Sequence, residues 1–136
     1  MTDLQIAKSG LTGHTVCLCK GETTIVSDKR GIAPIMDFIA EGVDLRGYSV
    51  ADLVVGKAVA MLFAKCGIVS VFAKTLSLGG RAVLVKYEIP CEYETLTDKI
   101  INRAGTDICP MEKAVGETEN LEEAYALLKE KISRTD

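Results

Sequence analysis

The feature that most constrains the fold is a long apolar segment in the middle of the chain, from Val50 to Cys66. Asp52 and Lys57 interrupt it, and it ends at Gly67, a residue type that commonly follows a helix. A helix that is apolar on nearly all faces is buried on more than one side. We therefore expect a central helix over 50–66. The segment is shorter than the roughly 20 residues of a membrane span, so no membrane association is expected.

Other segments of the chain carry shorter local signals. Two β-rich runs flank a Lys20-Gly21-Glu22 turn and predict a hairpin. The stretch 81–87 is ambiguous between helix and strand, and Pro90 within 89–93 favours an edge strand. The remaining expected elements are helices over 3–11, from Pro34 to Gly42, at Pro110 and over 121–132, and a buried strand over 68–73.

This order of elements predicts one sheet between helical layers. The sheet should be mixed, because its first pair is a hairpin and its later strands arrive through crossover helices. The expected fold class is α/β, a three-layer α/β/α sandwich. With 136 residues the chain has the usual size of one domain, so we expect a single domain over 1–136.

Composition excludes some partners and favours one compartment. A net charge of −3 with scattered basic residues, no Trp and 5% aromatic residues argues against a nucleic-acid partner. The N-terminus lacks the basic and apolar regions of a signal peptide, so a cytoplasmic location is expected. Five cysteines without regular spacing predict reduced thiols, with Cys17 and Cys19 as packing residues.

Two motifs carry a resemblance to a known family. They are Val54-Val55-Gly56-Lys57-Ala58 and the block from Ile101 to Val115, which contains Cys109-Pro110-Met111-Glu112. With them the chain resembles the domain of unknown function numbered eighteen-ninety-three, a family of small microbial proteins. The resemblance implies a cytidine-deaminase-like fold.

The zinc motifs of such deaminases are missing from this sequence. They require His or Cys two residues before a Glu at the start of the central helix, and Pro-Cys-x-x-Cys at the start of the next helix. The expected helix begins Val50-Ala51-Asp52, and the segment 74–80 contains no sulfur or imidazole group. We therefore expect no zinc deamination, no metal and no cofactor.

Several polar residues are candidates for a site. Lys57 lies among apolar neighbours, where a desolvated amine acts as a base, nucleophile or anion anchor, but its stem can equally extend to the surface. Gly56, in the expected mid-helix position, suggests that a ligand or a neighbouring strand packs closely there. Glu112 either caps its own helix or shares a pocket with Asp52 as an acid, and Cys109 at a helix start is a candidate reactive thiol.

The remaining candidates lie in the loop before Pro110. Arg103 is the expected second anchor for phosphate or carboxylate. Asn102 and Thr106 either orient a polar ligand or complete a tight turn at Gly105.

Three functions remain open from the sequence. The first is binding of a nucleotide-like or ribose-bearing small molecule without zinc chemistry. The second is a metal-independent enzyme that uses Lys57 with Asp52 or Glu112. The third is a structural or partner-binding subunit, and the resemblance makes a homo-oligomer plausible.

Overall fold

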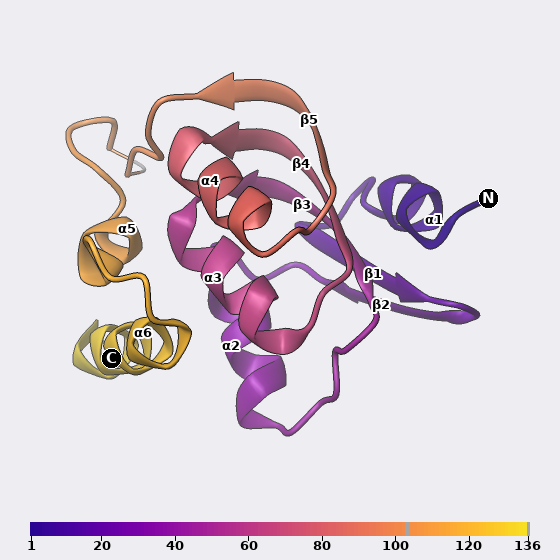
Figure 1. The fold of residues 1–136 in the computed structure, drawn as a ribbon, viewed down its shortest axis with the longest axis horizontal. Coiled ribbons are helices and arrows are strands. Elements are labelled where there is room, and N and C mark those ends of the chain that lie inside the picture. The colour runs from indigo at the N-terminus through magenta and orange to yellow at the C-terminus, as the bar shows by residue number, and fades with distance from the viewer. Residues whose placement is uncertain (103, 136) are drawn as a thin grey trace.

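A computed structural model describes residues 1–102 and 104–135 as a mixed five-stranded sheet with helices packed on it (Figure 1). The helices are α1 (Asp3–Gly10), α2 (Ala33–Ala40), α3 (Lys57–Cys66), α4 (Leu78–Lys86), α5 (Pro110–Val115) and α6 (Leu121–Thr135). The strands are β1 (Val16–Lys20), β2 (Thr23–Ser27), β3 (Ser49–Val55), β4 (Ser70–Ser77) and β5 (Cys91–Thr97).

The sheet has the strand order β2-β1-β3-β4-β5. The expected hairpin is confirmed as the antiparallel pair β1 and β2, and β1 also runs antiparallel to β3. β3, β4 and β5 are parallel and are connected through α3 and α4. The mixed sheet and the edge position expected for the strand over 89–93 are therefore confirmed, although β5 begins only after Pro90.

The expected single helix over 50–66 is wrong. Its first part is β3, Gly56 is the N-cap, and the helix α3 begins only at Lys57. A parallel strand buried on both faces has no alternating pattern, so its apolar run merges with that of the following helix. The second part of the expectation holds, because the residues from Ala58 to Phe63 are buried and α3 ends at Gly67 with φ +78°.

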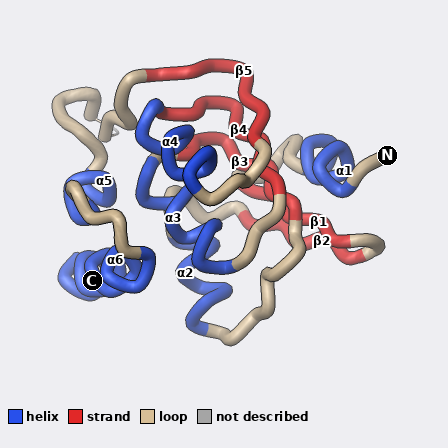
Figure 2. Tube along the Cα trace, in the orientation of Figure 1, coloured by secondary structure: helices blue, strands red, loops and turns tan. Residues whose placement is uncertain are grey.

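The ambiguous stretch 81–87 is mostly helical and belongs to α4. Ser77 accounts for its start, because its hydroxyl accepts a hydrogen bond from the Gly80 amide N–H at 2.9 Å. The first helix begins at a capping box between Thr2 and Gln5. Figure 2 shows the described residues between β5 and α5 as loop.

Two hydrophobic clusters lie on opposite faces of the sheet. The larger one contains α3 with the inner sides of α2, α4 and α6. The smaller one lies under α1 and includes Cys17, Cys19 and Phe72, so the expectation that these cysteines pack in the interior is confirmed. In Figure 1, α1 stands apart from the other helices, across the sheet. No helix in the described residues is long and apolar enough to span a membrane.

Candidate functional site

A cleft opens where β3 ends and β1 begins. The two strands pair only as far as Val16 opposite Asp52, and beyond this point the loop after β2 passes over the gap. The resulting cavity has a volume of about 290 Å³. Its lining comprises Thr15, Lys29, Arg30, Gly31, Asp52, Leu53 and Val54, which we call the β3 cleft. In open α/β sheets, ligands bind outside the carboxyl ends of the parallel strands, which is where this cleft lies.

Asp52 is the buried acid of the β3 cleft, with only 8% of its surface exposed. The sequence predicted it at the start of a helix, but it lies within β3. Its Oδ1 accepts a hydrogen bond from the Leu53 amide N–H at 2.8 Å. Burial raises the pKa of Asp52 to about 7, although the amide N–H groups of Leu53 and Val54 act in the opposite direction. This carboxyl can therefore change its charge near neutral pH.

The two basic residues of the β3 cleft differ in whether they have an ion-pair partner. Lys29 forms an ion pair with Asp37 of α2. Arg30 is exposed, and within residues 1–102 and 104–135 its guanidinium has no ion pair or side-chain hydrogen bond. The Thr15 hydroxyl lies 2.8 Å from the Ser27 carbonyl oxygen and ties the end of β2 to the start of β1. Arg30 is thus a free cation at the rim of a cleft that contains a buried acid.

Glu112 occupies the N-terminus of α3. Its Oε1 accepts a hydrogen bond from the Lys57 amide N–H at 2.8 Å, and its Oε2 accepts one from the Ala58 amide N–H at 2.7 Å. A helix N-terminus favours a carboxylate because its first N–H groups have no partner within the helix. Glu112 therefore caps α3 rather than its own helix. Burial raises its pKa, against the lowering effect of these two N–H groups and Lys57.

Gly56 is required by this contact. A Cβ atom at position 56 would lie 1.8 Å from Glu112 Oε1 and 2.8 Å from Ile100 Cγ1. The expectation of a close neighbour at Gly56 is therefore confirmed, and that neighbour is another part of the same chain. The mid-helix position assigned to Gly56 is wrong, because the residue precedes α3.

Lys57 lies beside this capped helix start. Its Nζ donates a hydrogen bond to the Gly116 carbonyl oxygen at 2.9 Å, so the amine links α3 to the end of α5. The structure brings Gly56 and Glu112 together with Cys109 around a small, mostly apolar cavity of about 80 Å³. Val54 borders both this cavity and the β3 cleft. Asp52 and Glu112 thus line adjoining cavities rather than one shared pocket.

Asn102 and Thr106 form a turn. Asn102 Oδ1 accepts a hydrogen bond from the Thr106 amide N–H at 3.0 Å, and Gly105 has a φ of +72°. These contacts are those of a tight turn, the second of the two roles expected for Asn102 and Thr106. Neither residue lines the β3 cleft. Arg103, the second expected anchor, lies outside the described residues.

Within the described part of the chain, no three His, Cys, Asp or Glu side chains gather where they could hold a metal ion. Burial, reinforced by the neighbouring Cys19, raises the pKa of the Cys17 thiol, which disfavours a thiolate ligand.

Sequence reasoning missed Arg30 and Thr15 as cleft residues. The adjacent bases of Lys29-Arg30, directly after a hairpin, were the available signal. These residues lie beside Asp52 only because β1 pairs with β3, and the sequence of neither strand predicts that pairing.

Comparisons with known proteins place the chain in a family. A family model described as "Domain of unknown function (DUF1893)" matches residues 7–132. One similar solved structure is a DUF1893 family protein, TM1506, from Thermotoga maritima. It has 23% sequence identity and a TM-score of 0.81, over 98% of this chain and 91% of that chain. No curated protein matches the sequence significantly. The chain belongs to the DUF1893 family.

Proposed function

We propose that this protein binds a small polar molecule in the β3 cleft, such as a nucleotide or another ribose-bearing phosphate, without zinc chemistry. One observation carries the proposal: a buried acid, Asp52, and an arginine without an ion pair, Arg30, line the same cleft. A carboxyl group hydrogen-bonds sugar hydroxyls, and a guanidinium binds phosphate through two parallel hydrogen bonds.

Two further observations support a small ligand. The cleft volume of about 290 Å³ is close to the lower limit of small-molecule sites, roughly 300 Å³. The cleft also lies at the carboxyl end of β3, where doubly wound sheets bind their ligands. A cytidine-deaminase-like three-layer arrangement is part of the same proposal, supported by the order of elements and by α1 lying across the sheet from α3.

Isothermal titration calorimetry tests the site with three probes: adenosine 5′-monophosphate, ribose 5-phosphate and inorganic phosphate. We expect the two ribose phosphates to bind and phosphate alone to bind more weakly. Arg30→Met should weaken binding roughly tenfold or more, the size of a lost charge-assisted hydrogen bond. Arg81→Met is the matched control, because Arg81 is also exposed but lies on α4 and does not line the cleft. Equal binding by both variants would refute the assignment.

The anchors predicted from sequence, Lys57 and Arg103, remain a proposal of their own. Lys57 already donates to the Gly116 carbonyl, so a ligand would have to displace that contact. Lys57→Ala and Arg103→Ala should abolish nucleotide binding if these residues hold the phosphate. Unchanged binding in both variants would leave Arg30 as the anion anchor.

A metal-independent enzyme is the second candidate, favoured by one observation. The pKa of Asp52, raised by burial to about 7, suits a general acid or base at neutral pH. Lys57 would then supply the nucleophile. Borohydride trapping followed by intact-mass analysis detects an imine on Lys57 with sugar phosphates, and no adduct would remove the covalent route.

The third candidate is a partner-binding subunit, and its interaction surface would have to exclude Gly56. That residue is buried beneath Glu112 and Ile100 of its own chain. Light scattering tests for the homo-oligomer, and a monomer at all concentrations would argue against it.

A further inference from the structure

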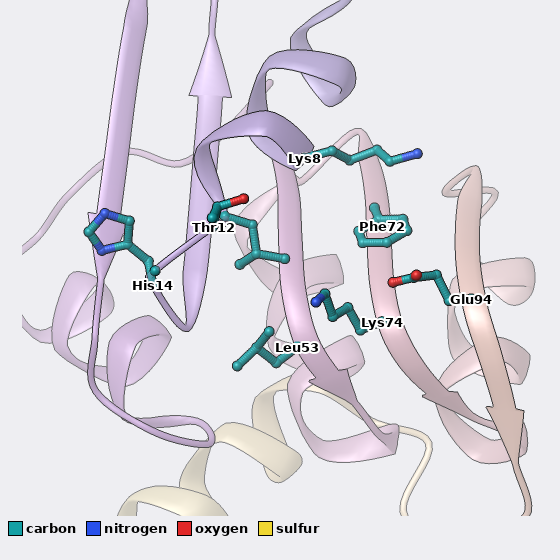
Figure 3. Close-up of a pocket in the computed structure, with 9 residues that line it drawn as sticks. Lys8, Thr12, His14, Leu53, Phe72, Lys74 and Glu94 are labelled. Atoms are coloured by element: carbon teal, nitrogen blue, oxygen red, sulfur yellow. The ribbon is translucent and has the colours of Figure 1, made fainter.

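A second hollow lies on the α1 side of the sheet, between the loop that follows α1 and strands β3, β4 and β5. Its volume is about 430 Å³, against about 290 Å³ for the β3 cleft. Leu11, Leu53 and Phe72 contribute its apolar surface, and Lys8, Lys74 and Glu94 contribute charged groups. Figure 3 shows the labelled ones, from Lys8 to Glu94, on one side of the sheet. We call this cavity the α1 hollow.

Some polar groups of the α1 hollow already have partners. Lys8 Nζ lies 3.0 Å from Glu92 Oε1 and 4.6 Å from the centre of the Phe72 ring. His14 Nδ1 lies 2.7 Å from Asp28 Oδ1. Both groups thus already have a partner within the protein.

Lys74 and Glu94 differ from these groups. Within residues 1–102 and 104–135, neither side chain makes an ion pair or a side-chain hydrogen bond. The parallel pairing of β4 and β5 aligns Ala73 with Tyr93 and Thr75 with Thr95, which places positions 74 and 94 next to each other on one face. In Figure 3 the Lys74 side chain extends toward β3, while the Glu94 carboxylate lies beside Phe72. The hollow thus presents two separate charges of opposite sign.

We propose that the α1 hollow binds a free α-amino acid with an apolar side chain. The ligand carboxylate would pair with the Lys74 ammonium, and the ligand ammonium would pair with the Glu94 carboxylate. Its side chain would cover Leu53 and Phe72, which lie in the cluster beneath α1. A simple anion would leave Glu94 unpaired, and an amine would leave Lys74 unpaired, so a zwitterion matches the hollow best.

This site is independent of the β3 cleft, although Leu53 borders both cavities. The two proposals use different charged residues, Asp52 and Arg30 in the cleft and Lys74 and Glu94 in the hollow. Either one can therefore fail without the other.

The test uses NMR titration of the uniformly 15N-labelled full chain. The probes are L-phenylalanine and L-leucine, with N-acetyl-phenylalanine and phenethylamine as analogues that lack the ammonium or the carboxylate. We expect saturable shifts of the Leu53 and Phe72 amide signals with both amino acids. Each analogue should bind roughly tenfold more weakly or worse, since each loses one charge-assisted contact.

Variants assign the contacts. Lys74→Met should weaken the binding of L-phenylalanine and should not affect phenethylamine, and Glu94→Gln should weaken L-phenylalanine and spare N-acetyl-phenylalanine. Lys99→Met is the control, because Lys99 is exposed and lies outside the hollow. All three positions are on the surface, and thermal unfolding midpoints check that the variants fold.

Three results would overturn the proposal. They are the absence of saturable shifts with either amino acid, equal binding of the zwitterions and both analogues, or binding that Lys74→Met and Glu94→Gln leave unchanged. Loss of amino-acid binding in Arg30→Met alone would likewise assign the ligand to the β3 cleft and refute the α1 hollow.

Discussion

Asp52→Asn should make the free energy of unfolding of this protein less dependent on pH. In the folded chain burial raises the pKa of Asp52 from 3.8 to about 7, so the native state holds a proton that the unfolded state has released. A raised carboxyl pKa therefore lowers stability as pH rises through this window. The Asn side chain is neutral at every pH, and its oxygen can still accept the hydrogen bond from the Leu53 amide N–H. The variant should lose this part of the pH dependence.

The expected size follows from the two pKa values. A rise from 3.8 to about 7 corresponds to at most roughly 4 kcal/mol, since one pKa unit is equivalent to about 1.36 kcal/mol. Relaxation and water entry around the ionised group reduce this value. We expect the difference in free energy of unfolding, D52N minus wild type, to increase by at least about 1 kcal/mol as the pH rises from acidic to mildly alkaline.

Urea unfolding at a series of pH values from about 4 to about 8 measures the effect. The difference between D52N and wild type cancels other titrating groups, including Glu112, whose pKa burial also raises. Asp98→Asn is the matched control, because Asp98 is exposed. A D52N minus wild-type difference that stays constant over this range would refute the assigned burial of a titrating carboxyl.

The remaining predictions concern the starts of α3 and α4. Gly56→Ala should cost about 2 kcal/mol or more in urea unfolding, because Glu112 must leave the α3 amides, whereas Gly79→Ala should be tolerated, since its Cβ would lie 3.5 Å from Lys57 Cβ. An equal loss in both variants would contradict this. Glu112→Gln should cost roughly 1–2 kcal/mol by the same assay, because an amide nitrogen would face one N–H donor. Ser77→Ala should cost about 1 kcal/mol through the lost α4 cap, and no change would argue against that cap.

Local signals were sufficient for part of the fold. The hairpin turn at Gly21, the helix stop at Gly67 and the edge position after Pro90 each depend on residues close in sequence, and each expectation is confirmed. The boundary between β3 and α3 could not be found in this way. Most of β3 and of the helix that follows is buried, and both are largely apolar, so Gly56 is the one residue that separates the strand from the helix.

The candidate site shows the same limit. The sequence singles out Lys57 by its apolar neighbours, Asp52 by its place at the expected helix start and Glu112 by its place shortly after Pro110. Their partners come from distant segments: Glu112 reaches the Lys57 amide across 55 positions, and the Arg30 loop meets Asp52 through strand pairing. Contacts of this kind arise from packing of the whole chain, so sequence spacing does not reveal them.

The capped start of α3 also determines where an anion can bind. A free helix N-terminus beside a sheet is the usual position for a phosphate, because its unpaired N–H groups and dipole favour negative charge. In this protein the Glu112 carboxylate already accepts from the Lys57 and Ala58 amides, and it does so within van der Waals reach of Gly56. An incoming phosphate would have to displace a carboxylate of its own chain. In the proposed β3 site, charged side chains such as Arg30 would take the role that helix amides have in other phosphate sites.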